Sequence, residues 1–240
     1  MVKVESYGDL LINGMGSSGG GSFKKVIING KGTVHGDVEC ESFQLSGSGT
    51  VNGSMKGNKG RISGTGTIEG DIEFDTFSIE GSGGIQKDAT IKSMTISGKG
   101  SIGGSLKGDE VKIRGKAAIK GDCESDVFKG EGGFTVGGLL NADLIDITII
   151  GECSAKEIGG QTIKVKQKPF GIMNLLKSVY PTSLTTEIIE GDEIEIENTN
   201  AKMVRGTNII VGPNCTIDVV EYKGTYTQHP SAKVRESRKL

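Results

Sequence analysis

Residues 62–72 read ISGTGTIEGDI, and the same pattern recurs at residues 45–55 (LSGSGTVNGSM), 79–89 (IEGSGGIQKDA) and 96–106 (ISGKGSIGGSL). The glycine at the third position of each copy belongs to a column of six glycines spaced seventeen residues apart. The column consists of Gly30, Gly47, Gly64, Gly81, Gly98 and Gly115. A second glycine follows two residues later in five of the six copies, and Ala117 takes its place in the sixth. Six copies in register define a seventeen-residue repeat.

Apolar residues fill three further columns, which lie two residues before each of these glycines, four residues after it and eight residues after it. The columns are Ile28, Leu45, Ile62, Ile79, Ile96, Ile113; then Val34, Val51, Ile68, Ile85, Ile102, Ile119; and Val38, Met55, Ile72, Ala89, Leu106, Cys123. All three offsets are even, which is the period of side chains on one face of a strand. One unit is too small to bury its own apolar face, but stacked units bury a continuous column. The repeat therefore predicts an all-β fold, a parallel β-helix of ~17-residue coils with these columns inside.

The coil length and the spacing of the apolar columns bear on the handedness of this helix. The rival architecture is the left-handed β-helix, whose coil is built from three hexapeptides. Here the coil has seventeen residues, and successive apolar columns are 6, 4 and 7 residues apart, so the coil does not divide into equal sixes. We therefore predict a right-handed β-helix.

The composition agrees with a folded, strand-rich chain. Ile (27) and Val (16) outnumber Leu (11), and β-branched residues favour strands. No apolar run approaches the ~18 residues that a membrane-spanning helix needs. The sequence shows no charged segment followed by an apolar leader, so we expect no secretory signal peptide. The net charge of −2 gives no sign of a nucleic-acid partner.

Two outward columns carry charge. Glu39, Lys56 and Glu73 place opposite charges on adjacent coils, which favours the predicted register. The other column is rich in aspartate and consists of Asp37, Ser54, Asp71, Asp88, Ser105 and Asp122. A carboxylate column invites a calcium hypothesis, but Ca²⁺ takes about six to eight converging oxygens. We interpret these residues as solvated turn aspartates and expect no metal or other cofactor.

A glycine-rich β-helical repeat of this length resembles that of the bactofilins, which are bacterial polymer-forming cytoskeletal proteins. The resemblance covers residues 26–158 and rests on the six copies of the repeat. It implies a protein that assembles with itself end to end without nucleotide and recruits envelope, cell-shape or motility proteins. It also implies a place in the cytoplasm, with peripheral contact to the inner face of the cell membrane. About eighty residues follow the repeat, which argues against unlimited end-to-end growth.

Three parts follow from the distribution of the repeat and of proline: residues 1–25, the β-helix over 26–160, and a C-terminal extension over 161–240. Thirty-five of the forty glycines precede residue 161, whereas all four prolines follow residue 168. This contrast supports the second boundary, because proline interrupts strand ladders.

The first part contains a short apolar patch and a glycine-rich run. Leu10, Leu11 and Ile12 predict a strand that caps the first coil, with membrane contact as the alternative. Residues 14–19 match the dinucleotide pattern G-x-G-x-x-G, but that pattern has meaning only between a strand and a helix. We expect a flexible or corner loop there.

The C-terminal extension is predicted to contain one short helix and further strands. Apolar residues recur at helical spacing between Pro169 and Pro181, and they are Phe170, Ile172, Met173, Leu175, Leu176, Val179 and Tyr180. We expect this helix to cover an edge or end of the β-helix, with contact to lipid as the alternative. Residues 187–227 return to strand patterns, and residues 231–240 are expected to form a basic, solvated tail.

Candidate self-assembly or membrane-contact residues come from both flanks. They are Leu10, Leu11, Ile12, Phe170, Ile172, Met173 and Leu176. Each is apolar and lies outside the regular repeat, so it does not belong to the apolar columns of the stacked coils. We therefore expect self-association to run through the ends of the β-helix.

Residues typical of catalysis are scarce. His35 lies at an outward turn position, and His229 precedes Pro230. Cys40, Cys123, Cys153 and Cys215 lack metal-ligand spacing and fit buried thiols in a reducing compartment. We predict a non-enzymatic, self-associating scaffold. The alternatives are an acyltransferase of the hexapeptide-repeat kind, which would need a pocket around His35, and a β-helical adaptor that dimerises without polymerising.

Overall fold

The computed structural model describes residues 8–167 and 182–240, and every helix or strand in these ranges is a β-strand. They form a parallel β-solenoid, as the repeat predicts. The described chain divides into two compact units. The first runs to Glu110 and includes Gly115–Gly121, and the second combines Val111–Arg114 with the described residues from Asp122 onward.

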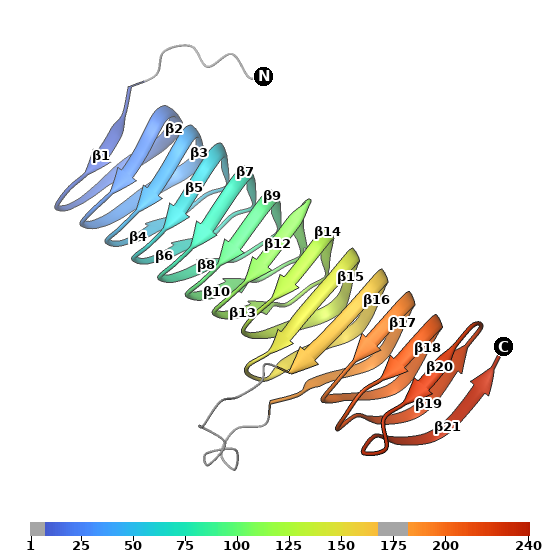
Figure 1. Cartoon of the computed structure of the whole chain (residues 1–240). Helices are drawn as coiled ribbons and strands as arrows, with labels where there is room; N and C mark the ends of the chain where they lie inside the picture. Colours follow the sequence, from blue (N-terminus) through green and yellow to red (C-terminus); the bar gives the residue numbers. More distant parts are fainter. Residues whose placement is uncertain (1–7, 168–181) are drawn as a thin grey trace, which may run out of the picture. The chain divides into compact units, whose positions relative to one another are not determined.

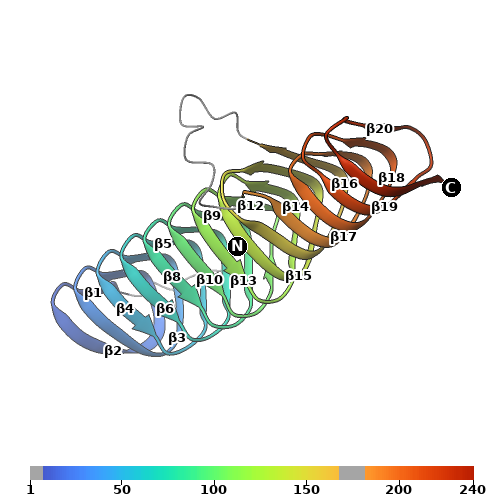
Figure 2. The ribbon, with the colours of Figure 1, turned by 90° about the horizontal axis from the view of Figure 1, so that it is seen from below.

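The strands of the first unit are β1 (Leu10–Ile12), β2 (Met15–Ile28), β3 (Lys31–Leu45), β4 (Ser48–Val51), β5 (Met55–Ile62), β6 (Thr65–Ile68), β7 (Ile72–Ile79), β8 (Ser82–Ile85), β9 (Ala89–Ile96), β10 (Lys99–Ile102), β11 (Leu106–Lys107) and β13 (Lys116–Ile119). Each coil pairs in parallel with the next (Figures 1 and 2). Residues seventeen apart face each other, as Ile62 faces Leu45 on one side and Ile79 on the other. The predicted coil length is confirmed, and the handedness stays a prediction.

The second unit contains β12 (Glu110–Ile113), β14 (Cys123–Gly130), β15 (Gly133–Ile149), β16 (Cys153–Gln167), β17 (Leu184–Ile196), β18 (Thr199–Val211), β19 (Thr216–Tyr222), β20 (Tyr226–Gln228) and β21 (Lys233–Lys239). Its ladder is also parallel from β14 to β21. The predicted further strands are therefore present, and the predicted boundary at 160/161 falls within β16.

The predicted helix between Pro169 and Pro181 lies outside the described residues, and so do Phe170, Ile172, Met173 and Leu176. No helix is found in the ranges that the structure describes. The ladder nevertheless resumes in register after this segment, because Cys153 of β16 faces Leu184 of β17.

The three predicted apolar columns form the core. No member of these columns is more than 2% exposed. The backbone alternates within each strand, so the residues directly beside a column position point outward and stay accessible, as with Thr67 beside the buried Ile68.

Two further core columns combine very large and very small residues, and the repeat analysis did not recognise them. In one column Gly60 lies between Phe43 and Phe77, whose rings stack with centroids 6.5 Å apart. A Cβ atom added at Gly60 would overlap the ring of Phe77. In the other column, a Cβ at Gly57 would approach the ring of Phe74 to 2.7 Å. The phenylalanines of one coil thus fill the space that the glycines of the preceding coil leave.

Two expectations about the flanks are wrong. The glycine-rich run at residues 14–19 does not form a loop, because Met15–Ile28 form β2. Glycine lacks the steric bulk that would obstruct close backbone pairing, so the run follows the ladder set by β3. The basic tail is also ordered, since Lys233–Lys239 form β21 and pair with β19.

Candidate assembly surfaces

Within the described residues, the first unit has an open strand edge at its N-terminal side. β1 pairs with only three residues of β2, namely Val26–Ile28. Among the described residues, none pairs with the outer edge of β2 from Met15 to Ser22. An unpaired row of backbone N–H and C=O groups is a template for another strand.

The side chains along this edge do little to block such pairing. Met15–Ser22 reads MGSSGGGS and contains no charged residue, although charges are the usual protection of an edge strand. The side chains at the inward positions are also smaller than on the next coil, because Ser18 is in register with Val34 and Gly21 with Val38. A partner at this edge would therefore be held mainly by backbone hydrogen bonds, with a small apolar contribution.

The predicted contact residues Leu10, Leu11 and Ile12 form β1 beside this edge. Ile12 is buried, Leu10 is half-buried and Leu11 is 55% exposed. Met15, which sequence reasoning missed, is 85% exposed at the start of β2. Of the described residues at this edge, Leu11 and Met15 are thus the largely accessible apolar side chains. The seventeen-residue period gave no signal for Met15, because its pairing with Lys31 joins residues that are sixteen apart.

The second unit ends in a strand edge of the opposite character. β21 pairs with β19 on one side, and no described residue pairs with its other side. Its sequence KVRESRK carries four cationic side chains and one acidic side chain, and all five are exposed. The two edges therefore differ in charge, although both have open backbone groups.

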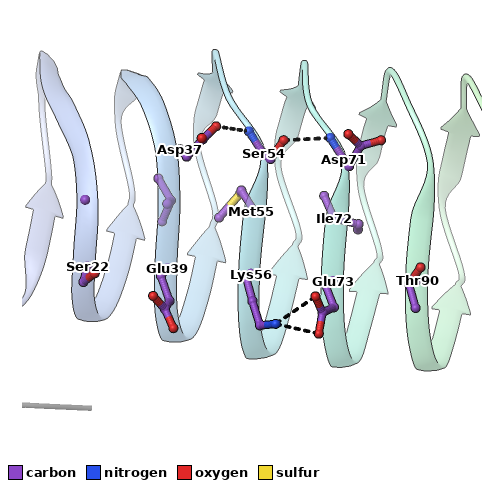
Figure 3. A pocket seen from close by; sticks show the side chains of 12 residues that line it. Ser22, Asp37, Glu39, Ser54, Met55, Lys56, Asp71, Ile72, Glu73 and Thr90 are labelled. Atoms are coloured by element: carbon purple, nitrogen blue, oxygen red, sulfur yellow. Dashed lines mark hydrogen bonds and ion pairs between the residues drawn. The ribbon is translucent and has the colours of Figure 1, made fainter. Parts of the chain in front are cut away.

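A shallow groove of about 550 Å³ runs along the outer face of the first unit (Figure 3). The aspartate column forms one wall, and its side chains accept hydrogen bonds from backbone N–H groups of the next coil. Asp37 Oδ1 accepts a hydrogen bond from the Ser54 backbone N–H at 2.8 Å, and Ser54 Oγ accepts one from the Asp71 N–H at 3.2 Å. Asp71 Oδ1 in turn accepts from the Asp88 N–H at 3.1 Å. The column therefore satisfies backbone donors between coils, a role that the repeat analysis missed.

The other wall of the groove carries a charge pair. Lys56 Nζ lies 2.8 Å and 2.9 Å from the two carboxylate oxygens of Glu73, which confirms the opposite charges predicted for adjacent coils. This pair raises the pKa of Lys56, chiefly through the hydrogen bond. Among the described residues, no cluster of three His, Cys, Asp or Glu side chains is arranged to hold a metal ion.

The histidine that an acyltransferase would require lies on the surface of the first unit. His35 is exposed, and its Nδ1 lies 3.2 Å from the Asn52 side-chain amide of the next coil. It does not line this groove or the smaller one on the second unit, which Thr162, Ile163, Lys164, Glu193, Ile194, Glu195, Asn208, Ile210 and Thr225 form. The structure places His35 within β3, as an exposed strand residue and not at the predicted turn position.

All four cysteines are buried and unpaired. Removal from water raises the pKa of Cys40 and Cys123 to about 12, and that of Cys153 and Cys215 to about 11. A neighbouring glutamate adds to the rise in each case. These groups are protonated at neutral pH, so they lack the thiolate that a nucleophile or metal ligand needs.

The buried thiols predict a loss of stability in alkali. An unfolded thiol titrates near its ordinary value of 9.0, so above that pH the unfolded chain releases protons that the folded chain keeps. The free energy of unfolding should therefore fall between pH 9 and 11, by up to about 1.4 kcal/mol per pH unit per thiol. Urea unfolding at several pH values measures this loss. Cys123→Ala should make it smaller, and an unchanged pH slope in that variant would contradict the assignment.

No helix among the described residues is both long and apolar enough to cross a membrane.

Comparisons with known proteins agree with the family resemblance that the repeat indicates. A family model described as "Bactofilin: Polymer-forming cytoskeletal" matches residues 3–86. The chain is 65% identical to the uncharacterized protein YhbE of Bacillus subtilis (strain 168) over 232 residues, which cover 96% of this chain and 98% of YhbE. It is 36% identical to the uncharacterized protein YhbF of the same organism over 104 residues, or 43% of this chain and 42% of YhbF. The YhbE match extends through both flanks, so the likeness is not confined to the repeats. No solved structure matches the chain.

Proposed function

Since the chain belongs to the bactofilin family, we propose that it is a non-enzymatic scaffold that self-associates end to end through the open edge of β2. The observation that carries this proposal is the uncharged stretch Met15–Ser22, whose outer edge pairs with none of the residues that the structure describes. An edge of this kind recruits another strand unless charge or a covering element prevents it. The family description as polymer-forming cytoskeletal proteins supports the same function.

The geometry of the first unit supports the end rather than the side as the contact surface. Inside the coil stack, each strand has a parallel partner on both sides, as β5 lies between β3 and β7. Its backbone groups are already used, so a second molecule gains little by approaching the side. At the end of the stack, a partner strand would satisfy the free backbone groups of β2 and cover Leu11 and Met15.

The non-enzymatic part of the proposal is supported by the family and by the chemistry of the described residues. Several polar side chains of the groove in Figure 3 make structural contacts, as in the Asp37–Ser54–Asp71 ladder and the Lys56–Glu73 pair. The histidine predicted for the acyltransferase alternative is a surface residue. The four thiols are protonated and buried.

We place this scaffold in the cytoplasm, where it would recruit envelope, cell-shape or motility proteins and contact the inner face of the membrane. The accessible Leu11 beside the open edge supports a surface contact of this kind. The apolar segment with Phe170, Ile172, Met173 and Leu176 is the second candidate for contact with the membrane or with another copy.

A specific observation favours a second function, that of an adaptor that dimerises without polymerising. Growth beyond a dimer requires both ends, and the edge of β21 carries four cationic side chains. Two such edges facing each other would oppose like charges, which destabilises strand pairing. Association would then stop after two molecules have joined through their β2 edges.

Charge placed at the β2 edge is expected to weaken self-association strongly. In the double variant Leu11→Lys with Met15→Lys, the two accessible apolar side chains become cations, while the coil behind them remains intact. We expect at least about tenfold weaker self-association because charges protect edge strands from pairing. Sedimentation velocity over a range of concentrations measures the effect, and circular dichroism checks the fold.

The matched control is Ser63→Lys, which adds a cation to an exposed corner within the coil stack. It should associate like the unmodified protein. The proposal fails if the unmodified protein is monomeric at high concentration, or if the control and the edge variant lose association equally. Dimers without larger species would favour the adaptor.

A further inference from the structure

Two rows of alternating charge cross the strands of the second unit and end on β21. In the first row, Glu187 lies 3.0 Å from Lys202, and Asp218 lies 4.0 Å from Arg235. The register aligns Lys202 with Asp218, because Ala201 faces Ile217 and Met203 faces Val219. The row therefore alternates from strand to strand: acid on β17, base on β18, acid on β19 and base on β21.

The second row alternates in the same way, three residues further along each strand. Arg205 lies 3.9 Å from Glu190 on one side and 2.7 Å from Glu221 on the other. Glu221 also lies 3.3 Å from Arg238. Its side chain is only 10% exposed, and each of its two oxygens faces a different arginine. This carboxylate is compensated because it has a cationic rung on both sides.

On the last rung, β21, no such second partner is found among the described residues. Arg235 and Arg238 end the two rows, and Lys233 and Lys239 add two cations on the same strand. The one acidic residue, Glu236, already lies 3.5 Å from Arg238. Among the described residues, no strand follows β21, although its outer backbone groups are free to pair (Figure 1). If both rows continued to alternate, the strand beside the outer edge of β21 would carry acidic side chains opposite Arg235 and Arg238.

We propose that the outer edge of β21 binds an extended acidic segment of a different protein, which adds one strand to the second unit and continues both charge rows. Backbone hydrogen bonds would supply the sequence-independent part of the affinity, and carboxylates opposite Arg235 and Arg238 would supply the specificity. The inference rests on the recruiting role proposed above, and it names the chemistry of the recruited partner.

A second copy of this chain fits the edge less well. Its own β21 would oppose like charges, and the open stretch Met15–Ser22 of β2 has no carboxylate to place against the arginines. The acidic strand β17 is already paired on both sides, with β16 and β18. We therefore expect the required carboxylates to come from another protein.

The test uses the full chain and a synthetic peptide that imitates the missing rung. The peptide EVEKTEE, with blocked ends and a fluorescent label, places carboxylates opposite Lys233, Arg235, Arg238 and Lys239, and lysine opposite Glu236. The control peptide QVQKTQQ keeps the shape and removes the negative charge. Fluorescence anisotropy measures binding, and hydrogen exchange locates it.

We expect the acidic peptide to bind at least about tenfold more tightly than the control and to lose affinity with added salt. It should also slow hydrogen exchange of the amides within Lys233–Lys239. The protein variant Arg235→Gln with Lys239→Gln should bind it at least about fivefold more weakly. Arg238 is left intact because it compensates the buried Glu221. The matched variant Lys99→Gln with Lys116→Gln removes two exposed cations from the first unit and should not change binding.

Equal binding of the two peptides would overturn the inference, as would protection away from β21 or no binding at about 1 mM peptide, where affinity is already weak. The variant Leu11→Lys with Met15→Lys separates this inference from self-assembly, since it should still bind the acidic peptide. If the peptide fails to bind while the protein still self-associates, the inference about the partner alone is wrong. If the peptide binds to a protein that never self-associates, only the assembly proposal fails.

Discussion

Ile68→Asp is expected to unfold or aggregate the protein, whereas Thr67→Asp should leave it folded. Ile68 is 1% exposed and lies in an inward column between Val51 and Ile85. A carboxylate at this position would be buried among aliphatic side chains without a partner, at a cost of several kcal/mol, on the order of the whole stability of a domain. Urea unfolding followed by circular dichroism measures the loss.

The neighbouring Thr67 is the matched control because it lies on the same strand and faces outward. An aspartate there stays in contact with water, and surface changes usually alter stability by about 0.5 kcal/mol or less. Similar losses in the two variants would contradict the assignment of inward and outward columns.

The pair Gly60 and Phe77 is expected to show strong coupling in a double-mutant cycle. Gly60→Leu should destabilise the protein by about 3 kcal/mol, because the new side chain would occupy the space of the Phe77 ring. Phe77→Ala should cost about 3–5 kcal/mol, since it leaves a cavity against Phe43 and Phe74. In the double variant, the leucine fills part of that cavity. The combined loss should therefore be smaller than the sum by about 2 kcal/mol.

A control for the glycine substitution is available within the same chain. No atom lies within 4 Å of a Cβ built at Gly19, so Gly19→Ala should change the free energy of unfolding little. Additive losses at Gly60 and Phe77, measured by urea unfolding, would contradict the packing of rings over glycines described above.

The repeat was sufficient to predict the architecture, because strands that pair seventeen residues apart determine both the sequence period and the length of a coil. Ile28, Leu45 and Ile62 are spaced by the coil length, so the spacing gives the register, and their even offsets give the inward face. The columns around Gly57 and Gly60 escaped recognition for a physical reason. In these columns a phenylalanine on one coil lies next to a glycine on the neighbouring coil, so the summed side-chain volume stays similar. The residue type does not repeat from coil to coil, and a search for like residues does not find the column.

The ends were harder to predict than the stack. The run Met15–Ser22 has the composition of a loop, and tertiary pairing with β3 overrides that local preference. Likewise, Lys233–Lys239 has the charge of a solvated tail, but its arginines meet carboxylates that are placed by the register of β19. Such pairings join residues seventeen apart in a part of the chain where the glycine columns are absent, so local patterns do not reveal them.

Hydrogen exchange at the β2 edge as a function of protein concentration tests the central claim most directly. If molecules join through this edge, the amides of Met15–Ser22 should exchange more slowly at high concentration than at low concentration. Exchange within the paired strand β5 should not change with concentration. The edge variant Leu11→Lys with Met15→Lys should show fast exchange at Met15–Ser22 at every concentration. Equal exchange of these amides in the assembled and the dispersed unmodified protein would contradict assembly through this edge.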